Sequence, residues 1–281
     1  MKTLITLVFT LVLSCSWAQQ EFTAFEVKVT GSGDPILLFP GFSCTQEVWK
    51  ETIATLSEQY ECHAFTFAGF GEVPPIDSPW LDTIKEQLLQ YVTSNHLEQP
   101  HLLGHSLGGT LSLWLAAEHG DQFGELVVVD ALPAMGALMI PNFKAEHIAY
   151  DTPYNKQMLA MSEEAFGQMA VQMATGMTTD ESKRTKIANW IEQTDRETYV
   201  YGYTDLLKMD MREGLPKIKN KVTLLAATVP YGRAAAEQTY KTQYEGLKDY
   251  ELHFAEGSAH FIMFDKPEWF KDQITQAFLL Q

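Results

Sequence analysis

The sequence predicts an α/β fold: a mostly parallel sheet flanked by helices, with a helical segment inserted late in the chain. Short apolar runs alternate with stretches of helical periodicity, which is typical of strand–helix–strand units. The alternation stops over residues 132–216, where only helical patterns occur, and then resumes. The 281 residues, 46% of them hydrophobic, are enough for one large domain with such an insert.

Each expected strand is an apolar run bounded by turn residues. Strands are expected at residues 25–29, 35–39, 63–67, 101–103, 125–129, 222–227 and 250–254. Helices are expected around residues 48–56 and 80–92, over 107–118, and over 267–280 at the end of the chain. Within the insert, Phe166, Met169, Met173 and Met177 recur at helical spacing. The expected division is a core of residues 19–131 and 217–281, with 132–216 as a helical cap.

The charge balance argues against a nucleic-acid partner, because proteins that bind nucleic acids are usually basic. Twenty Lys and Arg residues face 36 Asp and Glu residues, so the net charge is −16. The three cysteines are too few for a disulfide scaffold. Cys44 follows one strand and Cys62 opens the next. We therefore expect them at opposite edges of the sheet and unpaired.

Residues 1–18 are typical of a secretory signal peptide. Lys2 supplies the positive charge, residues 4–13 form a short apolar run, and Ser16 and Ala18 are the small residues before a cleavage site at Gln19. An alternative is a lipoprotein signal in which Cys15 is lipidated. Both predict an exported protein, periplasmic or secreted. No other segment is long and apolar enough to span a membrane.

The most specific motif is Gly104-His105-Ser106-Leu107-Gly108, which fits G-x-S-x-G between an expected strand and an expected helix. A serine at such a sharp turn projects its hydroxyl out of the fold, and small residues two before and two after it give the turn its clearance. The following helix begins under the serine, and its N–H groups favour developing negative charge. These features predict a nucleophilic serine at position 106.

A serine nucleophile needs a base, and His260 is the candidate among eight histidines. It follows the last expected strand, in the loop 257–261. That loop lies at the carboxyl edge of the sheet, where Ser106 is also expected and where open α/β sheets bind their ligands.

Together these residues resemble the α/β-hydrolase superfamily over residues 26–281. The resemblance implies an eight-strand, mostly parallel sheet with a helical cap inserted after the sixth strand. Residues 39–42, Phe-Pro-Gly-Phe, occupy the place of the family's oxyanion loop, with Pro40 where the family has histidine. By position, the backbone N–H groups of Phe42 and Leu107 would form the oxyanion hole.

The expected acid departs from the family's usual pattern. The loop after the seventh strand of the family, here residues 228–232, contains no carboxylate, and none occurs before Glu237. A known variant of the superfamily carries its acid after strand six, where Asp130 stands. The order Ser106, Asp130, His260 is the family's order of nucleophile, acid and base. The alternative is that Asp130 only holds its loop.

The substrate pocket is expected to be apolar. Seven of the 11 methionines lie between Met135 and Met177, and methionine suits surfaces that accept varied apolar ligands, although most of these side chains are expected to pack the cap against the sheet. Phe70, Met135, Met139 and Phe261 are the expected pocket residues. The sequence has no zinc-protease motif and no Cys/His cluster with metal spacing, so no metal or cofactor is expected.

These observations predict an exported serine esterase that cleaves small-molecule carboxylic esters of apolar acyl or aryl groups through an acyl-enzyme. A lactonase is a close alternative, and a cofactor-free lyase or a perhydrolase with the same triad is a further one, because the fold does not fix the chemistry. A different class would be a non-catalytic protein that binds an apolar ligand under the cap.

Overall fold

The computed structural model describes residues 22–278, so the expected signal peptide and Cys15 lie outside the described residues. A seven-stranded sheet runs through the centre of the molecule in the order β1-β3-β2-β4-β5-β6-β7. Only β1 is antiparallel to its neighbour, and the other pairs are parallel. The strands are β1 (Phe25–Gly31), β2 (Asp34–Phe39), β3 (Tyr60–Phe67), β4 (His101–His105), β5 (Leu126–Val129), β6 (Val222–Ala227) and β7 (Tyr250–Ala255).

The expectation of eight strands is wrong for residues 22–278. It came from the family resemblance, whereas the apolar runs in the sequence correspond to the seven strands that form. The described chain enters the sheet at β1, which pairs antiparallel with β3 at the edge. Asp130 consequently follows β5 rather than a sixth strand.

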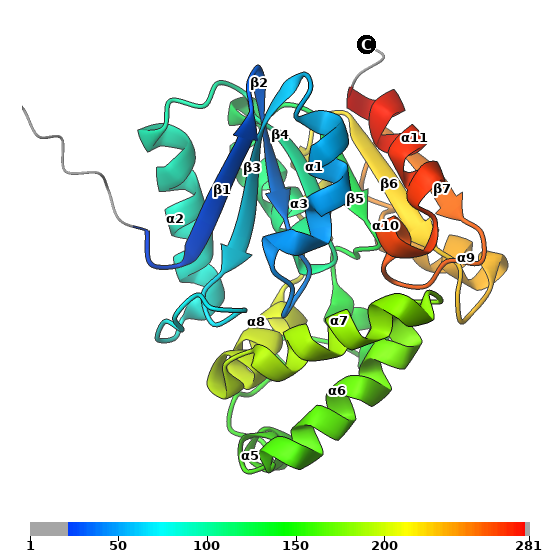
Figure 1. Cartoon of the computed structure of the whole chain (residues 1–281). Coiled ribbons are helices and arrows are strands. Elements are labelled where there is room, and N and C mark those ends of the chain that lie inside the picture. Colours follow the sequence, from blue (N-terminus) through cyan, green and yellow to red (C-terminus); the bar gives the residue numbers. More distant parts are fainter. Residues whose placement is uncertain (1–21, 279–281) are drawn as a thin grey trace, which may run out of the picture.

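Helices cover both faces of the sheet, and the insert lies beyond the carboxyl ends of the strands (Figure 1). The core helices are α1 (Lys50–Leu56), α2 (Trp80–Ser94), α3 (Leu107–His119), α9 (Arg233–Gln243), α10 (Ile262–Asp265) and α11 (Pro267–Phe278). The helices of the insert are α4 (Met135–Met139), α5 (Pro153–Leu159), α6 (Glu163–Met177), α7 (Glu181–Gln193) and α8 (Tyr203–Lys208). Single turns of 3-10 helix lie at Gln46–Trp49, Gly120–Gln122, Ala145–His147 and Leu215–Lys217, and a π-helical turn lies at Thr198–Gly202.

Each inner strand buries side chains on both faces. In β2, Leu37 and Phe39 belong to the apolar cluster beneath α2 and α3, whereas Ile36 and Leu38 belong to the cluster beneath α1 and α11. This is the pattern of a parallel sheet covered by helices on both sides. It explains why the strands appear in the sequence as unbroken apolar runs.

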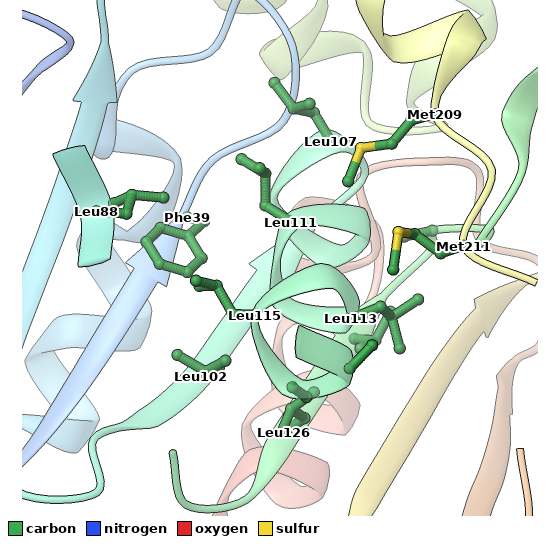
Figure 2. Close-up of a cluster of buried hydrophobic side chains, with 14 of the residues drawn as sticks. Phe39, Leu88, Leu102, Leu107, Leu111, Leu113, Leu115, Leu126, Met209 and Met211 are labelled. Carbon is green, nitrogen blue, oxygen red and sulfur yellow. The ribbon is translucent and has the colours of Figure 1, made fainter. Parts of the chain in front are cut away.

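Helix α3 is buried over most of its surface, because the sheet and the insert enclose it. Figure 2 shows Leu111 and Leu115 pointing toward Phe39 and Leu88, while Leu113 points toward Met211. A helix that is apolar nearly all round belongs inside a protein. Its first residue follows Ser106, so the most deeply packed helix of the core fixes the position of that serine.

The region between β5 and β6 is helical, without a strand in residues 132–216. The expected stripe of Phe166, Met169, Met173 and Met177 lies on α6, where Phe166 is fully buried and the three methionines pack partly buried beside it.

Cys44 and Cys62 are both buried and free. Burial raises the pKa of the Cys62 thiol to about 12, so this thiol is neutral. Among residues 22–278 no helix is both long and apolar enough to cross a membrane.

Two histidines in the sheet make the stability of the fold depend on pH. Burial lowers the pKa of His63 and of His101 below the ordinary value of 6.5. The neutral His101 Nδ1 also accepts a hydrogen bond of 3.0 Å from the Glu125 N–H, which a protonated ring could not do. Below pH 6.5 these histidines bind protons in the unfolded chain more readily than in the folded chain. The free energy of unfolding therefore decreases as the pH falls.

We predict that the free energy of unfolding decreases between pH 7.5 and pH 5.5, by up to about 1.4 kcal/mol per pH unit for each such proton. Replacing His101 by Asn keeps an acceptor for the Glu125 N–H but removes the titration. His101→Asn should therefore show a flatter pH dependence in urea unfolding. Equal slopes for the two proteins would contradict this account.

Candidate active site

Ser106 sits in a strained turn between β4 and α3. Its backbone has φ 53° and ψ −118°, a conformation that non-glycine residues rarely adopt. Close packing enforces the turn: a Cβ on Gly104 would lie 2.2 Å from the carbonyl oxygen of Gly108, and one on Gly108 would lie 2.3 Å from that of Phe39. The two glycines of the motif are therefore required by backbone contact.

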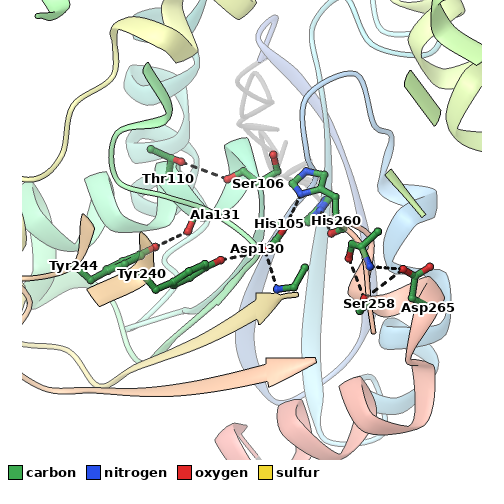
Figure 3. A network of polar contacts seen from close by, with 12 residues as sticks. His105, Ser106, Thr110, Asp130, Ala131, Tyr240, Tyr244, Ser258, His260 and Asp265 are labelled. Atoms are coloured by element: carbon green, nitrogen blue, oxygen red, sulfur yellow. Dashed lines mark hydrogen bonds and ion pairs between the residues drawn. The ribbon is translucent and has the colours of Figure 1, made fainter. Parts of the chain in front are cut away.

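The structure brings Asp130 and His260 together. Oδ2 of Asp130 lies 2.7 Å from Nδ1 of His260. Figure 3 shows the imidazole between Asp130 and Ser106, with the serine hydroxyl beside the ring. Because Nδ1 is engaged by the carboxylate, the other ring nitrogen remains for the serine. A nucleophile, a base and an orienting acid would have to lie in this order.

The second carboxylate oxygen of Asp130 is held by two donors. Oδ1 accepts a hydrogen bond of 2.9 Å from the Ala227 N–H at the end of β6 and one of 3.2 Å from the Tyr240 hydroxyl. Tyr240 comes from α9 and is buried. Burial and the neighbouring carboxylate raise its pKa well above the ordinary value, so the phenol stays protonated and donates.

Tyr244 supports this arrangement one turn further along. Its ring stacks on Tyr240 with centroids 5.6 Å apart, and its hydroxyl donates to the carbonyl of Ala131 at 2.8 Å. The two tyrosines thus hold Asp130 and Ala131 from the same side (Figure 3). Sequence reasoning missed both residues because it did not predict α9. The available signal was the spacing of four between two aromatic residues in an otherwise polar segment.

His105 contacts the loop that carries His260 (residues 257–261, the histidine loop) on the side away from Asp130. It is fully buried, and its Nε2 donates to the backbone carbonyl of His260 at 3.0 Å. Burial, reinforced by the nearby His260, lowers the pKa of His105 well below its ordinary value. A neutral imidazole next to the serine in the chain therefore anchors the backbone of the candidate base.

The proposed oxyanion donors lie beside the serine. A Cβ on Gly41 would come within 3.3 Å of the Ser106 Cβ, so the loop that carries Phe42 packs directly against the turn. Leu107 is the first residue of α3. Within residues 22–278, the N–H groups of Phe42 and Leu107 have no acceptor in the protein. They are available to a ligand atom at this position.

A cavity of about 250 Å³ adjoins Ser106 and His260 beneath the insert. Of the residues expected to line it, Met135 and Phe261 do so. The others that line it are Gly41, Phe42, Ser43, Cys44, His105, Met173, Met177, Ile187, Trp190, Ile191, Tyr199, Tyr203 and Leu206. None of these residues is Lys, Arg, Asp or Glu, so the cavity is apolar and uncharged apart from the histidines.

Two of the expected pocket residues do not line the cavity. Phe70 is fully buried beneath Phe42, with ring centroids 5.1 Å apart, and therefore supports the oxyanion loop from below. Met139 is 55% exposed at the end of α4, where its sulfur contacts the Tyr203 hydroxyl. The sequence correctly places both residues near the carboxyl edge of the sheet, but it does not show which layer of side chains each one occupies.

The π-helical turn contributes the aromatic part of the roof. Tyr199 lies within it and Tyr203 directly follows it, and both line the cavity and pack edge-on against Phe42. A π-helical turn changes the direction of side chains within a helix and often occurs at functional sites. Here it aims two aromatic rings of the insert at the oxyanion loop.

The chain is similar to several known proteins. A family model described as "Alpha/beta hydrolase family" matches residues 36–273. A pimeloyl-(acyl-carrier protein) methyl ester esterase from Vibrio cholerae is 28% identical over 110 residues, which cover 39% of this chain and 42% of that protein. The chain thus spans less than half the length of this relative.

Two lactonases match over most of their length. 3-Oxoadipate enol-lactonase 1 from Acinetobacter baylyi is 21% identical over 87% of this chain and 89% of its own. The crystal structure of the enol-lactonase from Burkholderia xenovorans LB400 superposes with a TM-score of 0.75, at 15% identity, over 92% of this chain and 96% of that one. The structural likeness bears on the fold alone.

Proposed function

Because this chain belongs to the alpha/beta hydrolase family, we propose that it is an exported serine hydrolase that cleaves carboxylic esters of small, uncharged acyl or aryl groups. The observation that carries the proposal is the juxtaposition of the strained Ser106, the Asp130–His260 pair and a mostly apolar cavity. A protein that only binds an apolar ligand would have no use for this set of reactive groups.

In the proposed reaction, the Ser106 oxygen attacks the ester carbonyl while His260 takes the hydroxyl proton. The N–H groups of Phe42 and Leu107 stabilise the tetrahedral oxyanion, at about 3 kcal/mol for each donor. The alcohol then leaves with the proton from His260, and the acyl group remains on Ser106. Water, deprotonated by His260, releases the carboxylic acid and restores the serine. Asp130 keeps the imidazole oriented and stabilises its protonated form.

The cavity supports the choice of substrate class. Its volume of about 250 Å³ lies below the range of roughly 300–1,000 Å³ that is usual for drug-sized ligands, so short acyl groups fit best. No cationic side chain lines it, and burying an unpaired carboxylate is costly. A lactone is an internal ester. Lactones are therefore the second candidate substrates, which the similarity to lactonases favours.

Export is proposed from the sequence of residues 1–18 alone. N-terminal sequencing of the protein from its native host should begin at Gln19. If the segment is instead a lipoprotein signal, the N-terminus should be a blocked, lipidated Cys15. An intact Met1 in cytoplasmic protein would exclude export.

We predict that Ser106 is the residue that reacts covalently. The purified protein should be labelled by a fluorophosphonate probe and should hydrolyse p-nitrophenyl acetate, because both reactions need an activated serine. Ser106→Ala should abolish labelling and reduce kcat by several orders of magnitude while the Tm is maintained. If the folded variant hydrolysed the ester at the wild-type rate, the nucleophile would be another residue. A wild type that neither reacts with the probe nor hydrolyses esters would be a binding protein.

The role of Asp130 is tested by an isosteric change. Asp130→Asn keeps the shape of the side chain but favours the wrong imidazole tautomer, so we expect a loss on the order of 10⁴ in kcat. Glu237→Gln is the matched control, because Glu237 pairs with Lys241 on the surface at 2.6 Å. It should retain wild-type activity. Equal effects of the two substitutions would refute the assignment of Asp130.

Chain length is the third test. Across p-nitrophenyl esters from acetate to decanoate, kcat/KM should peak at a short chain and then fall, because a cavity of about 250 Å³ has little room for longer acyl groups. An ester with a terminal carboxylate should be a poorer substrate than its methyl-terminated analogue of equal length. A steady rise in kcat/KM with chain length would contradict the proposed substrate class.

A further inference from the structure

One carboxylate stands between the helical insert and the loop that carries His260. Asp265 lies at the end of α10, and each of its two oxygens accepts hydrogen bonds from a different part of the chain. Figure 3 shows Asp265 beside Ser258 and on the opposite side of His260 from Asp130. The proposed mechanism does not use this residue.

Toward the core, Asp265 binds the residues that immediately precede the candidate base. Oδ2 accepts from the Ala259 N–H at 2.7 Å, and the Ser258 hydroxyl, which donates to the Ala259 carbonyl at 2.9 Å, lies 3.4 Å from Oδ2. Ser258 is fully buried, and its carbonyl accepts from the N–H groups of Thr228 and Val229 after β6. The carboxylate therefore fixes the backbone one residue before His260.

Toward the insert, Asp265 binds the turn between α6 and α7. Oδ1 accepts from the Thr178 hydroxyl, from the Thr179 N–H at 2.9 Å and from the Asp180 N–H at 3.3 Å. A parallel link lies close by, where the Phe261 N–H donates to the Met177 carbonyl at 3.0 Å. Met177 and Phe261 both line the cavity. The turn is thus joined to the substrate cavity as well as to the histidine loop.

A neutral side chain cannot reproduce both halves of this link. An ionised carboxylate only accepts hydrogen bonds, whereas an amide of the same shape has one accepting oxygen and one donating nitrogen. In an Asn at this position, the nitrogen would face the donors of either the turn or the histidine loop. One of the two connections would therefore break.

We infer that Asp265 is a positioning residue that couples the placement of the insert to the placement of His260. Helices α6 and α7, which roof the cavity, cannot move away from the core at this turn without breaking the Oδ1 hydrogen bonds of the same carboxylate whose Oδ2 holds the backbone before the candidate base. The base is consequently in place only when the cavity is covered. The inference rests on the proposed function for the role of His260, but the coupling itself is a property of the fold.

The test uses a substitution in the insert that touches neither the cavity nor the reacting groups. Thr178 is 1% exposed, does not line the cavity and is similar in shape to valine. Thr178→Val removes the donor to Asp265 and an acceptor for the Asp180 N–H. The matched control is Thr175→Val on the exposed face of α6, where the hydroxyl donates only to the Val171 carbonyl.

We expect Thr178→Val to lower kcat for a short ester by about fivefold and Asp265→Asn to lower it by about twentyfold, with wild-type kcat in Thr175→Val. In the double variant, Thr178→Val should cause no further loss of kcat beyond that of Asp265→Asn, because Thr178 acts on the histidine through Asp265. If Thr178→Val lowered the Tm or raised KM while kcat stayed unchanged, the role would be structural only. Additive effects in the double variant would also overturn the coupling.

A second measurement does not depend on activity. Amide hydrogen exchange over residues 257–261 should be faster in Thr178→Val than in wild type or Thr175→Val, although the substitution is in the insert. Unchanged exchange there would overturn the coupling, even if Asp265→Asn failed to fold. If exchange were faster in Thr178→Val and Ser106→Ala nevertheless remained active, the coupling would be supported and the proposed function refuted.

Discussion

The site depends on one contact between backbones, where β4 crosses the start of α3. Gly104, Gly108 and the carbonyl of Phe39 meet without room for a Cβ, so the chain must turn sharply at Ser106. The turn holds the serine in a conformation that is costly by itself. The buried packing of α3 against the sheet and the insert stabilises it. Ser106 is therefore held by the buried core rather than by an exposed loop.

The polar groups around this turn form a second level of organisation. Parallel strands end at one edge, which brings the end of β5, the end of β6 and the loop after β7 together. Asp130 uses both of its oxygens there, one for His260 and one for Ala227 and Tyr240. Because few of its lone pairs are left for water, the acid stays oriented in a half-buried place where an unpaired charge would be unfavourable.

The core could largely be predicted from the sequence, because buried parallel strands leave apolar runs and the turn at Ser106 requires glycines at fixed positions. Asp130 and His260 could also be singled out, since Asp130 directly follows such a run and His260 lies in the loop after the last one. Tyr240 was harder to find, because α9 is mostly polar and Tyr240 and Tyr244 are the large side chains that it and its end bury. Phe70 and Met139 were misplaced because the layer a loop residue occupies depends on tertiary packing. Asp265 was missed because most of its partners are backbone N–H groups, which leave no side-chain pattern, and because its partners in the insert are distant in sequence.

The methionines that line the cavity also determine how the site would respond to oxidants. Met135, Met173 and Met177 line the cavity that adjoins Ser106, and the Met173 sulfur already accepts from the Tyr199 hydroxyl at 3.3 Å. Conversion to a sulfoxide turns a flexible apolar side chain into a polar one that accepts stronger hydrogen bonds. Peroxide would thus make the walls of the cavity more polar and leave the serine, histidine and aspartate chemically unchanged. Oxidative damage here would alter which molecules enter the site before it altered the chemistry itself.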